Sequence, residues 1–255
     1  MMFRKLKGDG KVILVLMLLM VAPIVLHGQV GIPKITIGIE EAKKPEDFVL
    51  AIRIVLLLTI LSLAPSILIM MTSFTRLIVV FHFIRTSLAT QTAPSNQILI
   101  GLALFITFFI MKPVLNEINA SAIQPYINGE ITQKEAIDNA IKPLKKFMLK
   151  QTRPKDLELF LDLRGEGRPA TPDELALSTV VPAFIISELK TAFQIGFLLY
   201  LPMLLIDMVI ASTLLSLGMM MLPPIMISMP FKIMLFVLVD GWHLIVESMV
   251  KGFIQ

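Results

Sequence analysis

Residues 182–217 read PAFIISELKTAFQIGFLLYLPMLLIDMVIASTLLSL, an apolar stretch that Pro202 interrupts. At 1.5 Å per residue, a helix of this length extends roughly 50 Å, more than the hydrocarbon core of a bilayer, about 30 Å thick, requires. We predict a helix that begins at Pro182, kinks at Pro202 and ends before Gly218-Met-Met-Met-Leu-Pro-Pro224. A second apolar helix is expected from Pro230 to about Val250. The two helices would form a long hairpin with an apolar, methionine-rich tip.

The composition of the whole chain indicates a membrane protein. Of its 255 residues, 56% are hydrophobic and 16% are charged, against roughly 45–50% and about 25% in an average soluble domain. The mean hydropathy of +0.82 excludes a disordered chain. The net charge of +4 comes largely from the extreme N-terminus rather than from a basic face, so nucleic acid is not an expected partner. The absence of cysteine excludes disulfides, thiolate metal sites and a thiol nucleophile.

Charged residues divide the chain into polar and apolar segments. Residues 1–51 contain twelve of them, residues 52–111 three, residues 112–178 twenty and residues 179–255 seven. We therefore predict an all-α fold of membrane-associated helical hairpins, with about four long apolar helices and one polar helical insert. The expected segments are a signal peptide (1–28), a polar N-terminal segment (29–51), a first apolar hairpin (52–117), a helical module (118–180) and a second hairpin with a Met-rich tip (181–255).

The N-terminus has the pattern of a secretory signal peptide. Basic residues up to Lys11 precede an uncharged run from Val12 to Leu26, which is short for a spanning helix. Gly28 is an acceptable small residue before a cleavage point, whereas Leu26 is a poor residue two positions earlier. Cleavage near residue 28 is the favoured interpretation, and an uncleaved anchor is the alternative.

The first hairpin is expected from two apolar stretches, residues 54–71 and 98–115. The only charges between them are Arg76 and Arg85, and short loops rich in Lys and Arg stay on the cytoplasmic side. This orientation places the polar insert outside, in agreement with an exported N-terminus. Arg76 and Arg85 serve either as topology markers or in packing and assembly.

The polar insert has ten basic and ten acidic residues, and we expect it to be a compact, solvated helical module on the exterior side. Thr132-Gln-Lys-Glu135 and Thr171-Pro-Asp-Glu174 match the capping box that starts a helix. Apolar residues at helical spacing between Ile137 and Met148 predict an amphipathic helix, and Gly165 is expected to end the next one. With no His, no Cys and no Gly-rich phosphate loop, the insert is interpreted as an assembly module.

Ionisable side chains in the second hairpin need partners, because a charge at membrane depth is costly unless it is paired or faces water. Glu188 and Lys190 lie two residues apart on a helix and cannot pair with each other. Their partners must come from another helix or another chain. Interhelical or intersubunit pairing is the favoured role of the ionisable set, and a proton or ion path is the alternative. The set is Glu188, Lys190, Asp207, Lys232 and Asp240.

Three consecutive methionines at the hairpin tip point around all sides of a turn, so at least one faces away from its own hairpin. Methionine usually fills irregular cores, and its thioether also binds Cu(I). Copper is disfavoured because there is no Cys and only three scattered His, which likewise suggest no catalytic site. Repeated around a ring of subunits, these side chains could close a pore. The tip residues are Met219, Met220 and Met221, with Gly218, Pro223 and Pro224 shaping the loop.

Six stretches of the sequence resemble the FliP family of the flagellar type III export gate, whose injectisome relatives are the SctR proteins. Together they span about residues 52–250, in the order of the family. The methionine triplet and Val239-Asp-Gly-Trp242 are more similar to the flagellar branch. The stretches are Met70-Met-Thr-Ser-Phe-Thr-Arg76, Gly101-Leu-Ala-Leu-Phe-Ile-Thr-Phe-Phe-Ile-Met111, Phe147-Met-Leu-Lys-Gln-Thr-Arg153, Ser187-Glu-Leu-Lys-Thr-Ala-Phe-Gln-Ile-Gly-Phe197, Gly218-Met-Met-Met-Leu-Pro-Pro224 and Pro230-Phe-Lys-Ile-Met-Leu-Phe-Val-Leu-Val-Asp-Gly-Trp242.

The resemblance implies a non-enzymatic subunit of a protein-conducting channel that needs no cofactor and no metal. Family members form a ring of five with FliQ and FliR, on which export apparatus proteins such as FlhA and FlhB build. The complex passes unfolded flagellar proteins across the bacterial inner membrane at the basal body, and the insert would be a periplasmic module. Met219, Met220 and Met221 match the methionine gasket of the family. A proton- or ion-coupled transporter or channel subunit is the alternative function.

Overall fold

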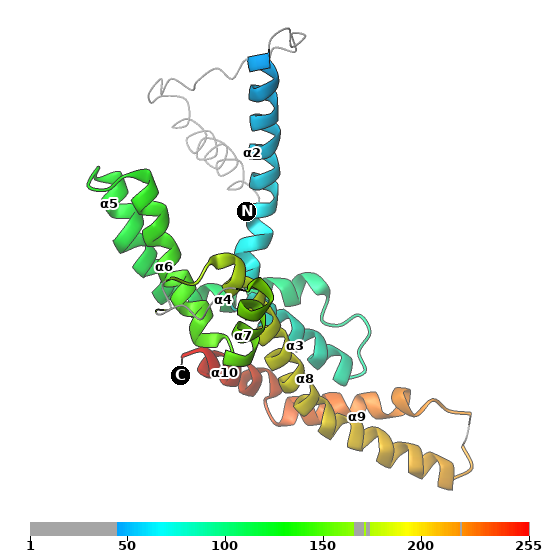
Figure 1. Cartoon of the computed structure of the whole chain (residues 1–255). Helices are drawn as coiled ribbons and strands as arrows, with labels where there is room; N and C mark the ends of the chain where they lie inside the picture. The colour runs from blue at the N-terminus through cyan, green and yellow to red at the C-terminus, as the bar shows by residue number, and fades with distance from the viewer. Residues whose placement is uncertain (1–44, 166–170, 172–173, 220, 255) are drawn as a thin grey trace, which may run out of the picture. The chain divides into compact units, whose positions relative to one another are not determined.

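The computed structural model describes residues 45–165, 171, 174–219 and 221–254, and every regular element in them is helical (Figure 1). This confirms the all-α prediction for that part of the chain. The predicted signal peptide lies outside the described residues. The elements are α2 (Pro45–Met70), α3 (Phe74–Ser87), α4 (Asn96–Ile118), the π-helix η2 (Asn119–Ile123), α5 (Gln124–Ile127), α6 (Gln133–Gln151), α7 (Pro154–Arg164), α8 (Leu177–Ser216), α9 (Pro224–Leu238) and α10 (Gly241–Ile254).

Two helical units are long and apolar enough to cross a membrane. They are Asn96–Ile127, in which α4, η2 and α5 follow one another directly, and Leu177–Ser216, which is α8. Together, α9 and α10 would make a third, which is bent by 62°. A shorter apolar helical stretch among the described residues, Ile52–Ile67, lies within α2. The described residues thus contain two or three membrane-capable units, and the expectation of about four long apolar helices is not confirmed.

The segment between the first two apolar stretches was expected to be a loop. It forms the buried helix α3 instead. Its apolar residues Leu77, Val80, Phe81 and Ile84 recur at helical spacing and are almost completely buried. They belong to the main hydrophobic cluster, which also takes residues from α4, α8, α9 and α10. The segment is therefore a helix packed in the hydrophobic core rather than an exposed loop.

The second hairpin consists of α8 and α9, which lie side by side in Figure 1. The prediction that the first of these helices begins at Pro182 is wrong, because α8 begins at Leu177. Thr179 and Val180 are fully buried, and their packing extends the helix upstream of the proline. The helix also continues through Pro202.

The helix after the tip begins at Pro224 rather than at Pro230, with proline at its first position. It ends at Leu238 instead of continuing to Val250, and the bend before α10 contains Asp240, which has a φ of 51°. A Cβ atom on Gly241 would lie 2.5 Å from the ring of Phe236. A larger residue at this position would force the Phe236 ring to shift.

Two of the caps predicted in the insert are confirmed. The backbone N–H of Thr132 donates to the Glu135 carboxylate at 2.8 Å, and the Thr132 hydroxyl accepts from the Glu135 N–H, which is the predicted capping box. The bond from the Thr132 backbone lowers the pKa of Glu135 below its usual value. α7 ends at Gly165, whose φ of 65° is left-handed. The capping box at Thr171 falls partly outside the described residues, and the next α-helix begins at Leu177.

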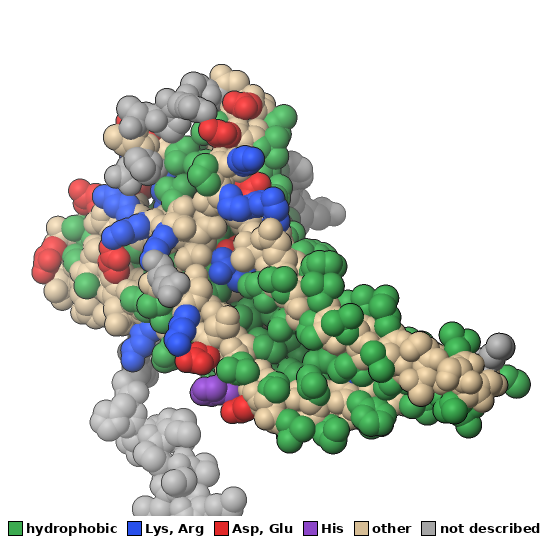
Figure 2. Space-filling view, turned by 90° about the horizontal axis from the view of Figure 1, so that it is seen from below, with side chains coloured by type: hydrophobic (Ala, Val, Ile, Leu, Met, Phe, Trp, Pro, Cys, Tyr) green, Lys and Arg blue, Asp and Glu red, His purple; other side chains and the backbone are tan. Residues whose placement is uncertain are grey.

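The surface of the α8–α9 hairpin is largely hydrophobic. Figure 2 shows hydrophobic side chains over most of its visible face, whereas Lys, Arg, Asp and Glu side chains gather away from its tip. Leu205 on α8 and Phe231 on α9 are more than half exposed, and they flank an entirely apolar groove of 520 Å³. Such a surface is suited to contact with lipid or with apolar faces of other subunits.

Gly196 sets the distance between α3 and α8, because a Cβ atom there would lie 2.9 Å from the Cβ of Phe83 and closer still to its ring. We expect Gly196→Ala to destabilise the protein by about 1–3 kcal/mol, since the atoms it meets lie close to the α3 backbone and cannot rotate away. The unfolding midpoint of the detergent-purified protein measures this.

The matched control is Gly101→Ala in α4, where an added Cβ would have no neighbour within 4 Å. There the same substitution should be neutral or stabilise by about 0.4–1 kcal/mol, because alanine restricts the unfolded chain. Equal effects at the two glycines would contradict the close packing of α3 on α8.

Candidate functional site

A deeply buried ion pair joins Arg76 of α3 to Glu188 of α8. The Nε of Arg76 donates to Glu188 Oε2 at 2.9 Å, and its Nη2 donates to Glu188 Oε1. Arg76 is 5% exposed and Glu188 is completely buried, so neither charge is solvated by bulk water. The structure thus places the partner of Glu188 on another helix of the same chain, although the sequence left another chain open.

The same arginine also contacts α6 and α10. Its Nη2 donates to Oε1 of Gln151, the last residue of α6, at 3.1 Å, and Gln151 Nε2 donates to the carbonyl oxygen of Phe253 at 3.4 Å. The guanidinium carbon lies 3.8 Å from the centroid of the Phe253 ring, within the range of a cation–π interaction. Arg76 therefore connects four helices, and its geometry is that of a packing residue.

A second polar cluster, beside Glu188, attaches α7 to α8. The hydroxyl of Ser187 accepts from the backbone N–H of Arg153 at 3.0 Å and donates to Asp156 Oδ2 at 2.5 Å. Arg153 Nη2 also donates to that oxygen, at 2.5 Å. Burial disfavours the charged carboxylate, but the bonds from Ser187 and Arg153 outweigh it and lower the pKa of Asp156. The sequence analysis did not predict this cluster. The only local signal for it is Asp156, an acidic residue in the first turn of α7.

The third polar contact joins the two arms of the hairpin. Lys232 Nζ on α9 lies 2.6 Å from Asp207 Oδ2 on α8, and Ser228 Oγ donates to Asp207 Oδ1 at 2.5 Å. The side chain of Lys232 is 2% exposed and that of Asp207 is 19% exposed. These bonds set the register of α8 against α9. Ser228 was not a predicted site residue, since nothing in its sequence surroundings marks it as polar core.

Lys190 and Asp240 are not brought into the buried contacts. Lys190 is exposed, and its charge contributes to the low pKa of Asp156 without forming an ion pair with it. Asp240 is exposed in the bend between α9 and α10, and no ion pair of Asp240 is found in the described part of the chain.

The methionines of the tip follow the left-handed Gly218, whose φ is 73°. Met219 is 49% exposed and Met221 is 97% exposed, while Met220 lies outside the described residues. Pro223 is the cap residue and Pro224 the first residue of α9. The tip thus presents thioether side chains outward from the end of the hairpin.

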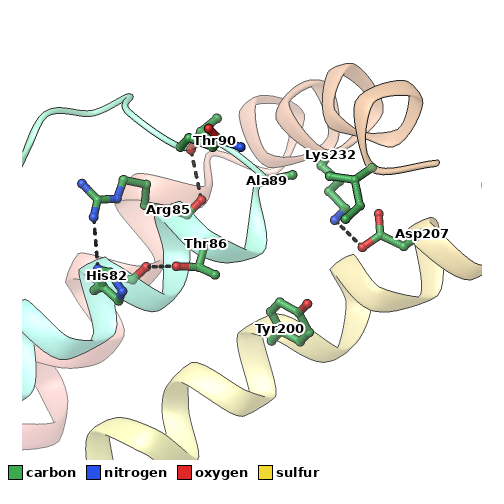
Figure 3. A pocket seen from close by; sticks show the side chains of 10 residues that line it. His82, Arg85, Thr86, Ala89, Thr90, Tyr200, Asp207 and Lys232 are labelled. Atoms are coloured by element: carbon green, nitrogen blue, oxygen red, sulfur yellow. Dashed lines mark hydrogen bonds and ion pairs between the residues drawn. The ribbon is translucent and has the colours of Figure 1, made fainter. Parts of the chain in front are cut away.

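Arg85 lies at the last turn of α3, beside a cavity of 440 Å³ (Figure 3). Its Nη1 donates to Asn96 Oδ1 at 2.5 Å and its Nη2 to His82 Nδ1 at 3.1 Å. Asp207, Lys232 and Tyr200 line the opposite side of the cavity. Within the described residues no group of three or more His, Cys, Asp or Glu could hold a metal ion.

These features define a membrane protein of apolar helices that are joined by buried ion pairs. The sequence model of the FliP family matches residues 57–249, and the chain belongs to that family. Three relatives, each named flagellar biosynthetic protein FliP, are similar over most of their length. That of Bacillus subtilis (strain 168) is 56% identical over 217 residues, 85% of this chain and 98% of the relative. That of Aquifex aeolicus (strain VF5) is 50% identical over 224 residues, which are 87% of this chain and 92% of the relative. That of Cereibacter sphaeroides is 48% identical over 217 residues, which are 85% of this chain and 72% of the relative.

Proposed function

We propose that this chain is a core subunit of the flagellar type III protein export gate. Several copies, five by the family resemblance, surround a channel that passes unfolded flagellar proteins across the bacterial inner membrane. FliQ, FliR, FlhA and FlhB are its partners in the basal body, and the module of α5, α6 and α7 faces the periplasm. No step of this function requires a reaction catalysed by the chain.

The observation that carries the proposal is the form of the α8–α9 hairpin. Its polar groups, Asp207, Ser228 and Lys232, are paired between its two arms, so its outer surface is left apolar. Its tip exposes Met219 and Met221. A ring of such hairpins has walls that pack against one another and a flexible, apolar constriction of methionines, which seals against ions and deforms around a passing chain.

A proton- or ion-coupled transporter is the second candidate, because Glu188 and Asp207 lie in a membrane-capable helix. Both carboxylates form an ion pair with a basic side chain of another helix. A carboxylate that carries protons has to exchange them with water, and the complete burial of Glu188 disfavours that exchange. Pairing therefore supports the gate.

Secretion by a deletion strain tests the proposal. Loss of the gene is expected to abolish flagellar export while small-solute uptake stays unchanged, and the wild-type chain restores export. A strain that exports flagellar proteins normally but has lost a solute flux would contradict the gate and favour the transporter.

The gasket is tested by replacing Met219, Met220 and Met221 with alanine in the complementing chain. Shorter side chains leave a wider constriction, so we expect increased ion leakage through the closed complex, measured as conductance in planar bilayers. The control is the double replacement of Met208 and Met234, which are exposed on the two arms of the hairpin. Unchanged leakage in the tip variant would rule out the methionine seal.

A further inference from the structure

The 440 Å³ cavity at the end of α3 has an excess of positively charged side chains in its lining. Three charged side chains line it: Arg85 from α3, Asp207 from α8 and Lys232 from α9 (Figure 3). Because Lys232 and Asp207 are paired with each other at 2.6 Å, Arg85 accounts for the excess. A cavity with one uncompensated cation at its edge favours an anionic ligand.

Arg85 has no carboxylate partner among the residues that the structure describes. Its two printed hydrogen bonds go to neutral acceptors, Asn96 Oδ1 and His82 Nδ1. Since a guanidinium can only donate, His82 Nδ1 must accept, which leaves the N–H of a neutral ring at Nε2. The two contacts hold the guanidinium in place without reducing its charge, and its remaining donors are available to a phosphate or carboxylate oxygen.

Two of the hydroxyl groups that line the cavity already donate hydrogen bonds within the protein, and a third does not donate to a described residue. Thr86 donates to the carbonyl oxygen of His82 at 2.9 Å, and Thr90 donates to that of Arg85 at 3.0 Å. No hydrogen bond of the Tyr200 hydroxyl to a described residue is found, and Tyr200 lines the cavity opposite Arg85. Arg85 and Tyr200 are therefore among the groups with donors to offer to a ligand.

A second, mainly apolar groove shares His82 with the cavity. This second cavity, of 170 Å³, is lined by Ile78, His82, Asn96, Leu99 and Ile100. His82 belongs to both cavities, so a site for an anion and a site for an apolar chain meet at one side chain. A ligand that fills both is an amphiphile with a negative head.

We propose that the two cavities bind an anionic phospholipid, with its phosphate at Arg85 and Tyr200 and an acyl chain along Ile78 and Ile100. Basic pockets between membrane helices bind such headgroups, and Asn96 and Leu99 of the groove belong to a membrane-capable helix. A carboxylate from a protein partner would satisfy Arg85 but would leave the adjoining groove without an apolar occupant. The site goes beyond the proposed export function and does not depend on it.

Lipid retention by the purified full-length protein tests this site. The protein is exchanged into mixed micelles that contain equal amounts of phosphatidylglycerol and phosphatidylcholine, and the retained lipids are quantified by mass spectrometry. We expect phosphatidylglycerol to be enriched about fivefold, as one charge contact of about 1 kcal/mol predicts. Arg85→Gln should abolish the enrichment, and Arg85→Lys, which keeps the charge, should preserve most of it.

Lys146→Gln is the matched control, because Lys146 is an exposed cation on α6, distant in sequence from both cavities. Equal loss of enrichment in Lys146→Gln and Arg85→Gln would overturn the site. Ile100→Asn should reduce retention of both lipids without changing their ratio, and an unchanged amount would overturn the acyl groove. Displacement of the lipid by millimolar inorganic phosphate would indicate a free-anion site instead. An Arg85→Gln variant that keeps its lipid ratio but loses a protein partner would indicate a protein contact.

Discussion

Replacement of Glu188 by alanine is expected to destabilise the folded chain by about 3–5 kcal/mol and to reduce the amount of assembled complex. The substitution leaves the guanidinium of Arg76 buried without its counter-charge, because Gln151 offers it only a neutral oxygen. Chemical unfolding in detergent measures the stability, and blue native electrophoresis of membrane extracts measures assembly. Assembly should fail before export energetics are affected.

The control is the double variant Arg76→Met, Glu188→Leu, which removes both charges and keeps most of the volume. It should regain most of the lost stability, since apolar replacements of a buried pair are often neutral. A Glu188→Ala protein that assembles normally but has lost proton-coupled export would contradict the packing role of the Arg76–Glu188 pair and favour a proton relay.

At the second buried pair, the two partners are expected to differ in the effect of their removal. Asp207→Ala leaves the ammonium of Lys232, 2% exposed, without an anion, and should cost about 3–5 kcal/mol. Lys232→Met leaves Asp207, which is 19% exposed at the edge of the cavity and keeps the hydrogen bond from Ser228. Its cost should be about 1–3 kcal/mol. Unfolding midpoints of the two variants, measured in one detergent, decide the order.

Lys251→Met provides the baseline for this comparison. Lys251 and Glu247 lie 2.7 Å apart on the exposed face of α10, and an exposed pair four residues apart contributes only about 0.3–0.5 kcal/mol. A Lys232→Met variant that is less stable than Asp207→Ala would show that the burial of the two groups does not set the cost.

Local signals in the sequence were sufficient where one segment decides its own structure. The capping box at Thr132 and the glycine at position 165 mark helix ends because their hydrogen bonds and backbone angles involve only nearby residues. The break from Gly218 to Pro223 was predictable for the same reason. Hydropathy also identified the apolar helices, since transfer into an apolar environment depends on composition.

Predictions failed where the decision came from another segment. Residues 74–87 were expected to form a loop, but they form a helix whose Leu77 and Phe81 pack into the core that α8 helps to form. The bend at Asp240 was not predicted, because the ring of Phe236 occupies the space beside Gly241 only after α9 and α10 fold together. The start of α8 was placed five residues late, since Pro182 was read without the burial of Val180.

The sequence by itself determined that the chain is helical and apolar, that a polar module interrupts it, and that ionisable groups in its last hairpin need partners. These properties follow from composition and from contacts within a few residues. Only the tertiary structure decided which partners they take, because Glu188 meets an arginine 112 residues away and Asp207 meets a lysine 25 residues away. It also placed Arg85 beside a cavity built from three helices. Pairings of this kind depend on how the helices pack against one another. The order of residues along the chain does not show which distant residues come into contact.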